Sequence, residues 1–421
     1  MRVFSSLPLP RMAIMRILNW PLEQLLRTSE VGPLLETAVR SSGWDLESWS
    51  LDRVYSRPHG ETSARFNATV SGTHITLVAS TRTLSETDRQ RLGAVRCEAG
   101  VGALFIWAHP SDPELPGLHV IETPTSLTDC LAAGLDEELT VTDVQMLVLR
   151  PLRRAVYRVA VVSDSGPRVL FLKVVRPSKA AELLARHRAC TLTPPTTDLG
   201  GGILMMDQAP GVALTELLYQ PSSPNPEVSI TPDVIISALQ AITPQALHLR
   251  ARSPVIERFG SMIDALVIGG ADRRRVDTLT SRIIRQARSS TQSRTPTHGD
   301  FHPANLFLTE DAQWPSALID ADTVGPGNRA DDLATMCAHL LALPSFDAAG
   351  YGGVPALVTE MWGATAGAYG EDLLARTAAS LLSIAPGARS PQQLDYYISQ
   401  AEHLLDTGHM SCIGHPVFDQ K

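Results

Sequence analysis

Short segments in the first half of the chain are apolar or alternate between apolar and polar residues. Alternation with a period of two predicts β-strands, because successive side chains of a strand point to opposite faces of a sheet. Residues 64–70 and 75–79 flank a turn that contains Gly72, which predicts a hairpin. The other predicted strands are 103–107, 144–149, 155–162, 169–175 and 203–206.

Apolar residues recur at helical spacing in the second half of the chain. Earlier in the chain, the same spacing predicts a helix over 18–39, interrupted near Gly32. Ser178 is a favourable N-cap residue and predicts another helix over 178–189. The helices predicted in the second half are 231–243, 254–267, 271–288, 330–344, 371–385 and 391–406.

The order of these elements divides the chain into three regions. Residues 1–140 mix helices and strands, residues 141–206 predict a small sheet with one helix, and residues 207–421 are mainly helical. The expected fold class is therefore α+β, with a small β-rich lobe followed by a helical lobe and preceded by an α+β extension.

Composition and charge exclude some classes of protein. The 421 residues are 44% hydrophobic and 19% charged, which indicates a globular chain with a full core and argues against disorder. The formal net charge of −8 disfavours a dedicated nucleic-acid binder, which normally carries a basic face. It is compatible with a cationic substrate and equally with ordinary solubility.

The five cysteines are widely spread, and none forms a C-x-x-C pair, so we expect buried thiols in a reducing compartment. No apolar run reaches the length of a membrane span. Arg2, Arg11 and Arg16 interrupt any signal-peptide core. We therefore expect a cytoplasmic protein with no membrane partner.

One segment among the predicted helices concentrates polar residues. Residues 297–308 read Thr-His-Gly-Asp-Phe-His-Pro-Ala-Asn-Leu-Phe-Leu, and residues 318–322 read Leu-Ile-Asp-Ala-Asp. Two short strands here predict a hairpin with Asp300, Asn305 and Asp320 at its edges. Phosphoryl transfer needs one carboxylate to accept the proton of the attacking hydroxyl, and an amide oxygen with a second carboxylate to hold Mg²⁺.

This pattern resembles the aminoglycoside phosphotransferase and choline kinase-like family, whose Asp-x-x-x-x-Asn spacing is that of Asp300 and Asn305. The resemblance implies a two-lobed protein-kinase-like fold that uses ATP and Mg²⁺. It further implies that Asp300 is the catalytic base and that Asn305 and Asp320 are Mg²⁺ ligands.

Residues 327–334 resemble the family's Gly-Asp-Pro-x-x-Asp-Leu-Ala element. By that resemblance, Asp332 braces the catalytic loop through its backbone. His298 and His302 are expected to support the same loop. Their H-x-x-x-H spacing suits zinc on a helix, but a segment with glycine and proline is not helical, so zinc is not expected.

The region upstream contains candidates for nucleotide binding. A kinase-like enzyme holds the α- and β-phosphates with a lysine on its third strand, oriented by a carboxylate on the next helix. Lys173 and Glu182 fit these two roles, and Met206 falls where the inter-lobe hinge would contact adenine. The alternatives are a solvent-facing edge-strand lysine and a solvated glutamate, with His187 facing the cleft instead.

The segment expected to cover the nucleotide, residues 149–157, has no glycine. Its backbone is therefore less able to approach phosphates closely, and the side chains of Arg153 and Arg154 could contact them instead. The alternative is that both are surface arginines. Residues 1–140 lie outside the resemblance, and this layout, with the loop at 109–117, is similar to that of maltokinase-like enzymes.

Two functional classes follow. The first is an ATP:alcohol phosphotransferase acting on an aminoglycoside, aminosugar or sugar; the second is a catalytically weak kinase-like module that binds partners through residues 1–140. A protein kinase is disfavoured, because Asp320 is followed by Ala-Asp and no Ala-Pro-Glu element is found. Acidic residues that could line an amine pocket lie on the last helices: Glu360, Asp372, Asp395, Glu402 and Asp406.

Overall fold

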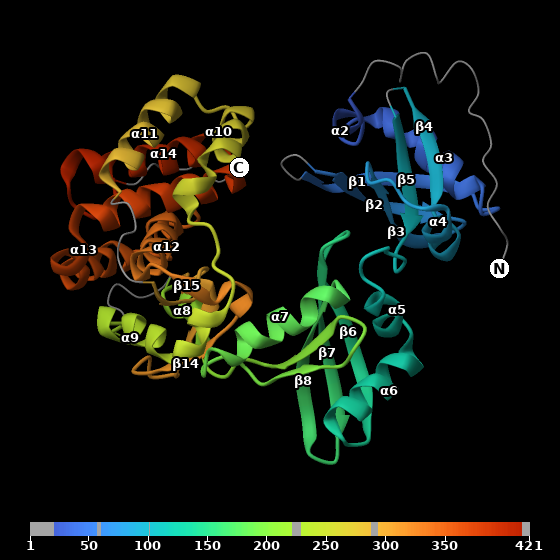
Figure 1. The fold of residues 1–421 in the computed structure, drawn as a ribbon, viewed down its shortest axis with the longest axis horizontal. Coiled ribbons are helices and arrows are strands. Elements are labelled where there is room, and N and C mark those ends of the chain that lie inside the picture. The colour runs from blue at the N-terminus through green and yellow to red at the C-terminus, as the bar shows by residue number, and fades with distance from the viewer. Residues whose placement is uncertain (1–20, 57–59, 101, 221–228, 288–293, 415–421) are drawn as a thin grey trace. The chain divides into compact units, whose positions relative to one another are not determined.

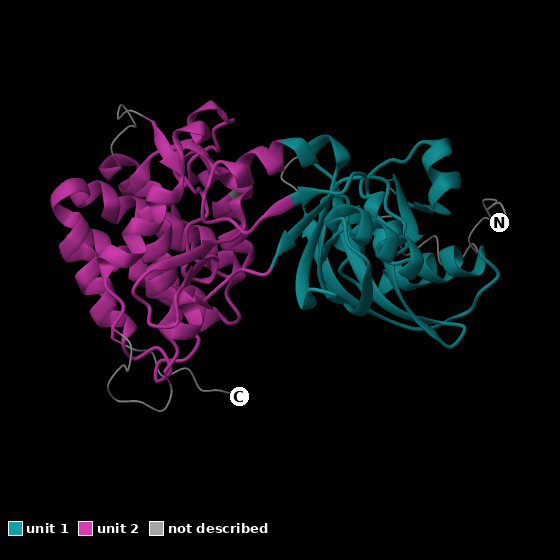
Figure 2. Cartoon of the chain, turned by 90° about the horizontal axis from the view of Figure 1, so that it is seen from below, with its two compact units in different colours: residues 1–181, 197–207 teal, residues 182–196, 208–421 magenta. Residues whose placement is uncertain are grey.

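The computed structural model describes residues 21–56, 60–100, 102–220, 229–287 and 294–414. The chain forms two compact units (Figure 2). Unit 1 comprises residues 1–181 and 197–207, and unit 2 comprises residues 182–196 and 208–421. The first twenty residues, including the arginines considered for a signal peptide, lie outside the described residues.

Unit 1 begins with an antiparallel five-stranded sheet of order β1-β2-β3-β5-β4. Its predicted hairpin is confirmed as β2 and β3, joined at Gly72 with φ 77°. The helix expected over 18–39, with an interruption near Gly32, forms two short helices, α2 and α3, with a 3₁₀ turn between them, and residues 18–20 lie outside the described residues. Helix α3 packs its apolar side, including Leu34 and Leu35, into a core with Phe66. The elements are α2 (Leu22–Leu25), α3 (Gly32–Arg40), β1 (Leu46–Ser56), β2 (Thr62–Val70), β3 (Thr73–Ser80), α4 (Glu86–Leu92), β4 (Val95–Ala99) and β5 (Gly102–Ala108).

A second five-stranded sheet of order β6-β7-β8-β10-β9 completes unit 1. Helices α5 and α6 lie along this sheet (Figure 1), and their Leu118 and Leu131 share a buried core with Tyr157 and Leu172. The predicted strands 144–149, 155–162, 169–175 and 203–206 are confirmed within longer strands. The elements are α5 (Gly117–Ile121), α6 (Pro124–Leu135), β6 (Leu139–Arg150), β7 (Arg154–Ser163), β8 (Gly166–Val175), α7 (Pro177–Arg188), β9 (Thr196–Asp198) and β10 (Ile203–Asp207).

Unit 2 is mainly helical. Its longest helix, α13, has a non-helical residue at Gly370, so the helix predicted at 371–385 is only its second half. The predicted helix 254–267 begins as a 3₁₀ turn and becomes α-helical at Phe259. The main helices are α9 (Pro232–Ser237), α10 (Phe259–Ile268), α11 (Arg273–Gln286), α12 (Arg329–Ala342), α13 (Val354–Ile384) and α14 (Pro391–Thr407).

Small strands carry the polar segment of unit 2. One sheet has the order β11-β13-β14, and β12 pairs with β15. The strands are β11 (Val212–Ala213), β12 (Thr295–Thr297), β13 (Leu306–Leu308), β14 (Pro315–Leu318) and β15 (Gly325–Gly327). With one β-rich region and one helical region, the predicted fold class is confirmed. Across the described part of the chain, no helix has the length and apolar character needed to cross a membrane.

The turn before β10 gives a stability prediction, because two glycines there share one conformation and differ in their surroundings. Gly200 and Gly202 both have φ 83°, but a Cβ at 202 would lie 2.2 Å from the carbonyl oxygen of Val175, whereas nothing lies within 4 Å at 200. Replacing either glycine by alanine strains the backbone. We expect Gly202→Ala to lower the free energy of unfolding by about 2–4 kcal/mol and Gly200→Ala by about 1 kcal/mol. Urea unfolding tests this, and equal losses would contradict it.

Candidate active site

The candidate catalytic loop, residues 298–305, is held between two pairs of strands. On one side β12 pairs with β15, with Thr297 opposite Gly325. On the other side the loop enters the β13–β14 hairpin, and the N–H of Ile319 donates to the carbonyl of Asn305 at 3.0 Å. This bond joins the end of the loop to the residue that precedes Asp320. The sequence therefore brings Asn305 and Asp320 to the same end of the hairpin.

Asn305 is only 6% exposed, and its orientation is fixed by the loop itself. Its side-chain amide nitrogen donates to the carbonyl of Asp300 at 2.9 Å, and its backbone N–H donates to the carbonyl of His302 at 2.9 Å. Because the amide nitrogen is used within the loop, the side-chain oxygen is the atom of Asn305 suited to contact a cation.

Asp320 adopts a left-handed backbone conformation with φ 53°, which aspartate tolerates better than most residues. Its charge and that of Asp300 both act on His298 and His302. The two carboxylates, twenty positions apart in the sequence, thus lie close enough for their charges to act on the same two imidazoles.

His298 is fully buried and His302 is half-buried, and their role in supporting the loop stays a prediction. Burial lowers the pKa of His298 to about 4, although the nearby carboxylates partly offset this shift. Burial also lowers the pKa of His302, whose ring stacks on that of His339 at 4.5 Å between centroids. Within the described ranges, no group of three or more His, Cys, Asp or Glu side chains could hold a metal ion, so a structural zinc site is not found there.

Asp332, in the first turn of α12, holds the start of the catalytic loop. Its two carboxylate oxygens accept from the N–H groups of His298 at 2.8 Å and Gly299 at 2.7 Å. The residue is 1% exposed, and burial raises its pKa to about 6 despite these hydrogen bonds. Gly299 has φ 77°, and a Cβ there would lie 2.8 Å from the carbonyl oxygen of Thr323. The loop therefore fits only because this position is glycine.

A buried charge network that sequence reasoning missed holds α12 in place. Arg376 of α13 donates to Asp331 at 2.6 Å and to Asp372 at 3.0 Å, and Arg376 and Asp372 are almost fully buried. The i, i+4 spacing of Asp372 and Arg376 was the available signal. This network fixes the residue next to Asp332 to another helix.

The second half of α7 is attached to the segment after Asp320. His187 lies 3.3 Å from a carboxylate oxygen of Asp322, and Arg186 donates to the carbonyl of Val324 at 2.5 Å. Glu182, predicted to orient Lys173, accepts from Arg186 at 2.8 Å. This bond lies within α7, and the role predicted for Glu182 toward Lys173 stays a prediction.

The other predicted nucleotide contacts belong to unit 1. Lys173 is 5% exposed on β8, an inner strand, where it lies opposite Val156 and Leu204. It is therefore not a solvent-facing lysine of an edge strand. Arg153 is exposed, while Arg154 and Met206 are half-buried. Their association with Asp300 stays a prediction.

Most of the acidic residues considered for an amine pocket are engaged by arginines. Asp395 and Glu402 bind Arg275, and Asp406 binds Arg282.

The side chain next to Asp300 is basic. Arg252 Nη1 lies 4.0 Å from Asp300 Oδ1. The same nitrogen donates to the carbonyl of Gly299 at 2.6 Å. The side chain of the proposed base therefore has an arginine beside it.

A known protein family matches the part of the chain that contains this loop. Residues 239–357, which include the whole catalytic loop and Asp332, match the model of the family described as "Phosphotransferase enzyme family". The match confirms the resemblance predicted from the sequence. No curated protein matches the chain.

Several solved structures show limited similarity. Aminoglycoside phosphotransferase APH(4)-Ia, solved as a thermostable mutant with AMP-PNP and hygromycin B, is 14% identical, with 68% of this chain and 99% of that chain covered at a TM-score of 0.45. A macrolide 2'-phosphotransferase type I is 17% identical, covering 66% and 96%, with a TM-score of 0.40. An ethanolamine kinase of Plasmodium vivax is 10% identical, covering 65% and 84%, with a TM-score of 0.39.

The raised pKa of Asp332 predicts a specific pH dependence of stability. Between its ordinary pKa of 3.8 and about 6, the folded chain keeps a proton that the unfolded chain has lost. The stability contributed by Asp332 therefore falls as pH rises through this window, by at most about 1.4 kcal/mol per pH unit, and is constant above it. Asp332→Asn lacks this titration.

Urea unfolding of wild type and Asp332→Asn at pH 4.5, 5.5 and 7.0 measures the effect. The difference in unfolding free energy, wild type minus variant, should decrease from pH 4.5 to 7.0. A difference that is constant or increases with pH would contradict the assignment of the raised pKa to Asp332.

Proposed function

We propose that this chain, whose catalytic-loop region matches the phosphotransferase enzyme family, transfers the γ-phosphate of ATP to a hydroxyl of a small molecule. The observation that carries the proposal is the arrangement of Asp300, Asn305 and Asp320 on one braced loop and hairpin. Chance polar residues in a turn would not be held by a buried carboxylate that accepts two backbone N–H groups from the same loop.

Asp300 is the group suited to act as the catalytic base. Its side chain is 39% exposed, in contrast to the buried residues that hold the loop, so a substrate hydroxyl can approach it. In the proposed reaction one carboxylate oxygen of Asp300 accepts the proton of the attacking hydroxyl as the new O–P bond forms and the bond from the γ-phosphorus to the β–γ bridging oxygen breaks, which releases ADP.

The donor set fits Mg²⁺. Asn305 and Asp320 supply an amide oxygen and a carboxylate, the hard ligands that this ion prefers. In kinase-like sites two such side chains are enough, because nucleotide phosphates and water complete the coordination. Bound there, Mg²⁺ would neutralise charge on the phosphates of ATP. Lys173, buried on β8, is the proposed contact to the α- and β-phosphates.

For the acceptor we propose a neutral polyhydroxylated molecule, such as a sugar, in preference to a polycationic aminoglycoside. Four of the five acidic residues considered for an amine pocket are paired with arginines, and an arginine lies next to Asp300. The positive charge of Arg252 would repel a polycation. Few of the carboxylates considered for its pocket are not already paired with an arginine. Sugar hydroxyls carry no such penalty.

The alternative function is a catalytically weak kinase-like module that acts by binding. Its support is the absence of glycine from residues 149–157. Against it, the residues proposed for chemistry are all present: Lys173, Asp300, Asn305 and Asp320. The experiment below separates the two functions.

Substitution of the proposed base tests the chemistry. We expect Asp300→Asn to lower kcat by about 10²–10⁴-fold, because the acceptor hydroxyl loses its base while the loop keeps its hydrogen bonds. Asp311→Asn is the matched control, since Asp311 is an exposed carboxylate in the turn of the same hairpin. Its kcat should equal that of wild type. The measurement is Mg²⁺-dependent ATP consumption with maltose, an aminosugar, an aminoglycoside and choline as acceptors.

Two results of that experiment would contradict the proposal. Equal rates in wild type and Asp300→Asn would remove Asp300 from the mechanism. Nucleotide binding without turnover on any acceptor, unchanged by Asp300→Asn, would favour the binding module.

The same acceptor panel tests the charge argument. We expect kcat/KM to be highest with the neutral sugar and lowest with the aminoglycoside. Arg252→Gln should narrow that difference, because it removes the positive charge nearest Asp300. A preference for the aminoglycoside in wild type would contradict the proposed acceptor class.

A further inference from the structure

The turn between β6 and β7, residues 150–153, has an unusual residue at its third position. The N–H of Arg153 donates to the carbonyl of Arg150 at 3.1 Å, Pro151 is second, and Leu152 is third with φ 64°. These are the features of a type II turn, whose third residue is normally glycine because of its positive φ. Leucine in this conformation is strained and needs compensation from its surroundings.

Burial of the Leu152 side chain supplies that compensation. The side chain is fully buried in a cluster formed with the first sheet and its connections, including Val78, Leu92, Phe105 and Trp107. Leu152 lies at the tip of the segment that is predicted to cover the nucleotide. This tip is therefore buried among residues of the amino-terminal region. That region is the part of the chain to which the family resemblance does not extend.

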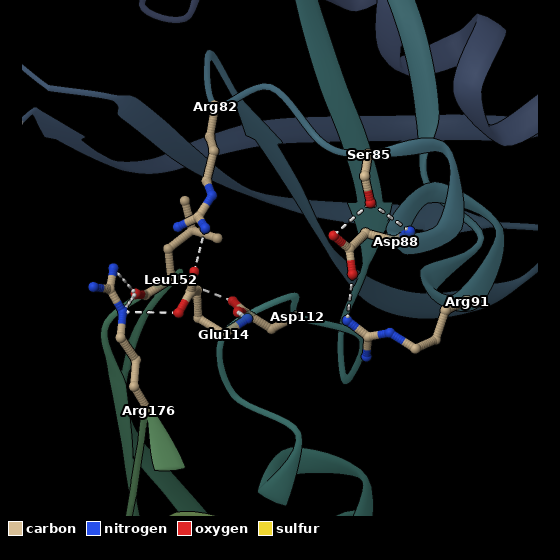
Figure 3. Close-up of polar contacts among 8 residues, drawn as sticks. All are labelled: Arg82, Ser85, Asp88, Arg91, Asp112, Glu114, Leu152 and Arg176. Carbon is tan, nitrogen blue, oxygen red and sulfur yellow. Dashed lines mark hydrogen bonds and ion pairs between the residues drawn. The ribbon is translucent and has the colours of Figure 1, made fainter. Parts of the chain in front are cut away.

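The backbone of Leu152 is held by Asp112 of the amino-terminal region and by Arg176, which follows β8 (Figure 3). Its N–H donates to Asp112 Oδ2 at 2.9 Å, and its carbonyl accepts from Arg176 Nη2 at 2.9 Å and Nε at 3.1 Å. Arg176 Nε is also 3.1 Å from Glu114 Oε2, and Glu114 binds Arg82. Both polar groups of one strained residue are thus satisfied by a connected set of charged side chains.

Asp112 is built into this contact. It is 3% exposed, and its second carboxylate oxygen accepts from the N–H of Glu114 at 2.8 Å. Burial raises its pKa to about 6, so the carboxylate is mostly ionised at neutral pH. Strand β6 is also held just before the turn. The side chains of Tyr55 and Arg65 donate to the carbonyl of Leu149, at 2.9 and 3.1 Å.

The clamp, defined as Asp112, Glu114, Leu152 and Arg176, also reaches the strand that carries the proposed phosphate-binding lysine. Arg176 directly follows β8, in which Lys173 lies three positions earlier. The clamp therefore links the β6–β7 turn to the end of β8, because the Arg176 side chain binds the backbone carbonyl of Leu152 and also Glu114 in a loop of the amino-terminal region.

We propose that the amino-terminal region positions the glycine-free β6–β7 turn for nucleotide binding, with Leu152 and Asp112 as positioning residues. The inference rests on the proposed function, because it assigns ATP to that turn. A glycine-rich loop approaches phosphates by its flexible backbone. Here the clamp fixes the turn before ATP binds. Less conformational entropy is therefore lost when Arg153 and Arg154 contact the phosphates than would be lost by a flexible loop.

Asp112→Asn tests the clamp, because the amide has only one acceptor oxygen and leaves one of two backbone N–H groups without its partner. Asp88→Asn is the matched control. Asp88 is an exposed aspartate of the same region that accepts from Ser85 and Arg91 and makes no contact with the turn (Figure 3). Arg176→Gln is the second test variant, since it removes the donors to the Leu152 carbonyl from a partly exposed position.

The full-length variants are compared by hydrogen–deuterium exchange of residues 149–157 without ligand, by AMP-PNP affinity, and by kinetics. We expect Asp112→Asn and Arg176→Gln to exchange faster in the turn and to raise the KM for ATP and the AMP-PNP Kd by about tenfold, with a much smaller change in kcat and in the acceptor KM. Asp88→Asn should behave as wild type. If Asp112→Asn does not fold, the same measurements on Arg176→Gln decide whether the clamp positions the turn.

The outcomes separate the clamp from the proposed function. If hydrogen–deuterium exchange in the turn of the folded variants equals that of wild type, the proposal that the clamp holds the turn is wrong. Faster exchange with unchanged AMP-PNP affinity would overturn its role in nucleotide binding. A wild-type chain that binds no AMP-PNP would overturn the proposed function and the nucleotide role together, while exchange in the ligand-free chain would still decide whether the clamp holds the turn.

Discussion

The candidate site depends on one buried carboxylate, that of Asp332. Two successive N–H groups of the catalytic loop have no partner in a strand or helix, and a buried N–H without an acceptor is costly. Asp332 accepts from both, and its neighbour Asp331 is fixed by Arg376. The resulting loop conformation determines where Asp300 and Asn305 lie. The chemistry proposed for the chain follows from that conformation rather than from the residue types alone.

Unit 1 uses the same physical device in a second place. Asp112 is also a buried aspartate with a raised pKa that accepts backbone N–H groups of loops, and one of these belongs to the β6–β7 turn. In both cases a short-range charge-assisted bond holds a segment that has no regular structure of its own. The cost of burying each carboxylate is acceptable only because both of its oxygens are used.

Local patterns in the sequence were sufficient to predict part of the fold and of the site. Period-two alternation predicted the β2–β3 hairpin, and the order of polar residues predicted which side chains the β13–β14 hairpin brings together. Strand β1 was missed because its residues are mostly exposed and show little apolar alternation. The first half of α13 was missed although its buried Val354, Leu357, Val358 and Met361 recur at helical spacing. The burial of Leu152 was missed because it depends on contacts with distant residues, which no local pattern contains. The positive φ of Leu152 in particular contradicts its intrinsic preference.

A crystal structure of the full chain with AMP-PNP and Mg²⁺ tests the central claim most directly. The account predicts a metal ion about 2.1 Å from the side-chain oxygen of Asn305 and a carboxylate oxygen of Asp320, with the γ-phosphate facing Asp300. A nucleotide bound away from this loop, or a metal ion that contacts neither residue, would contradict the assignment of the site.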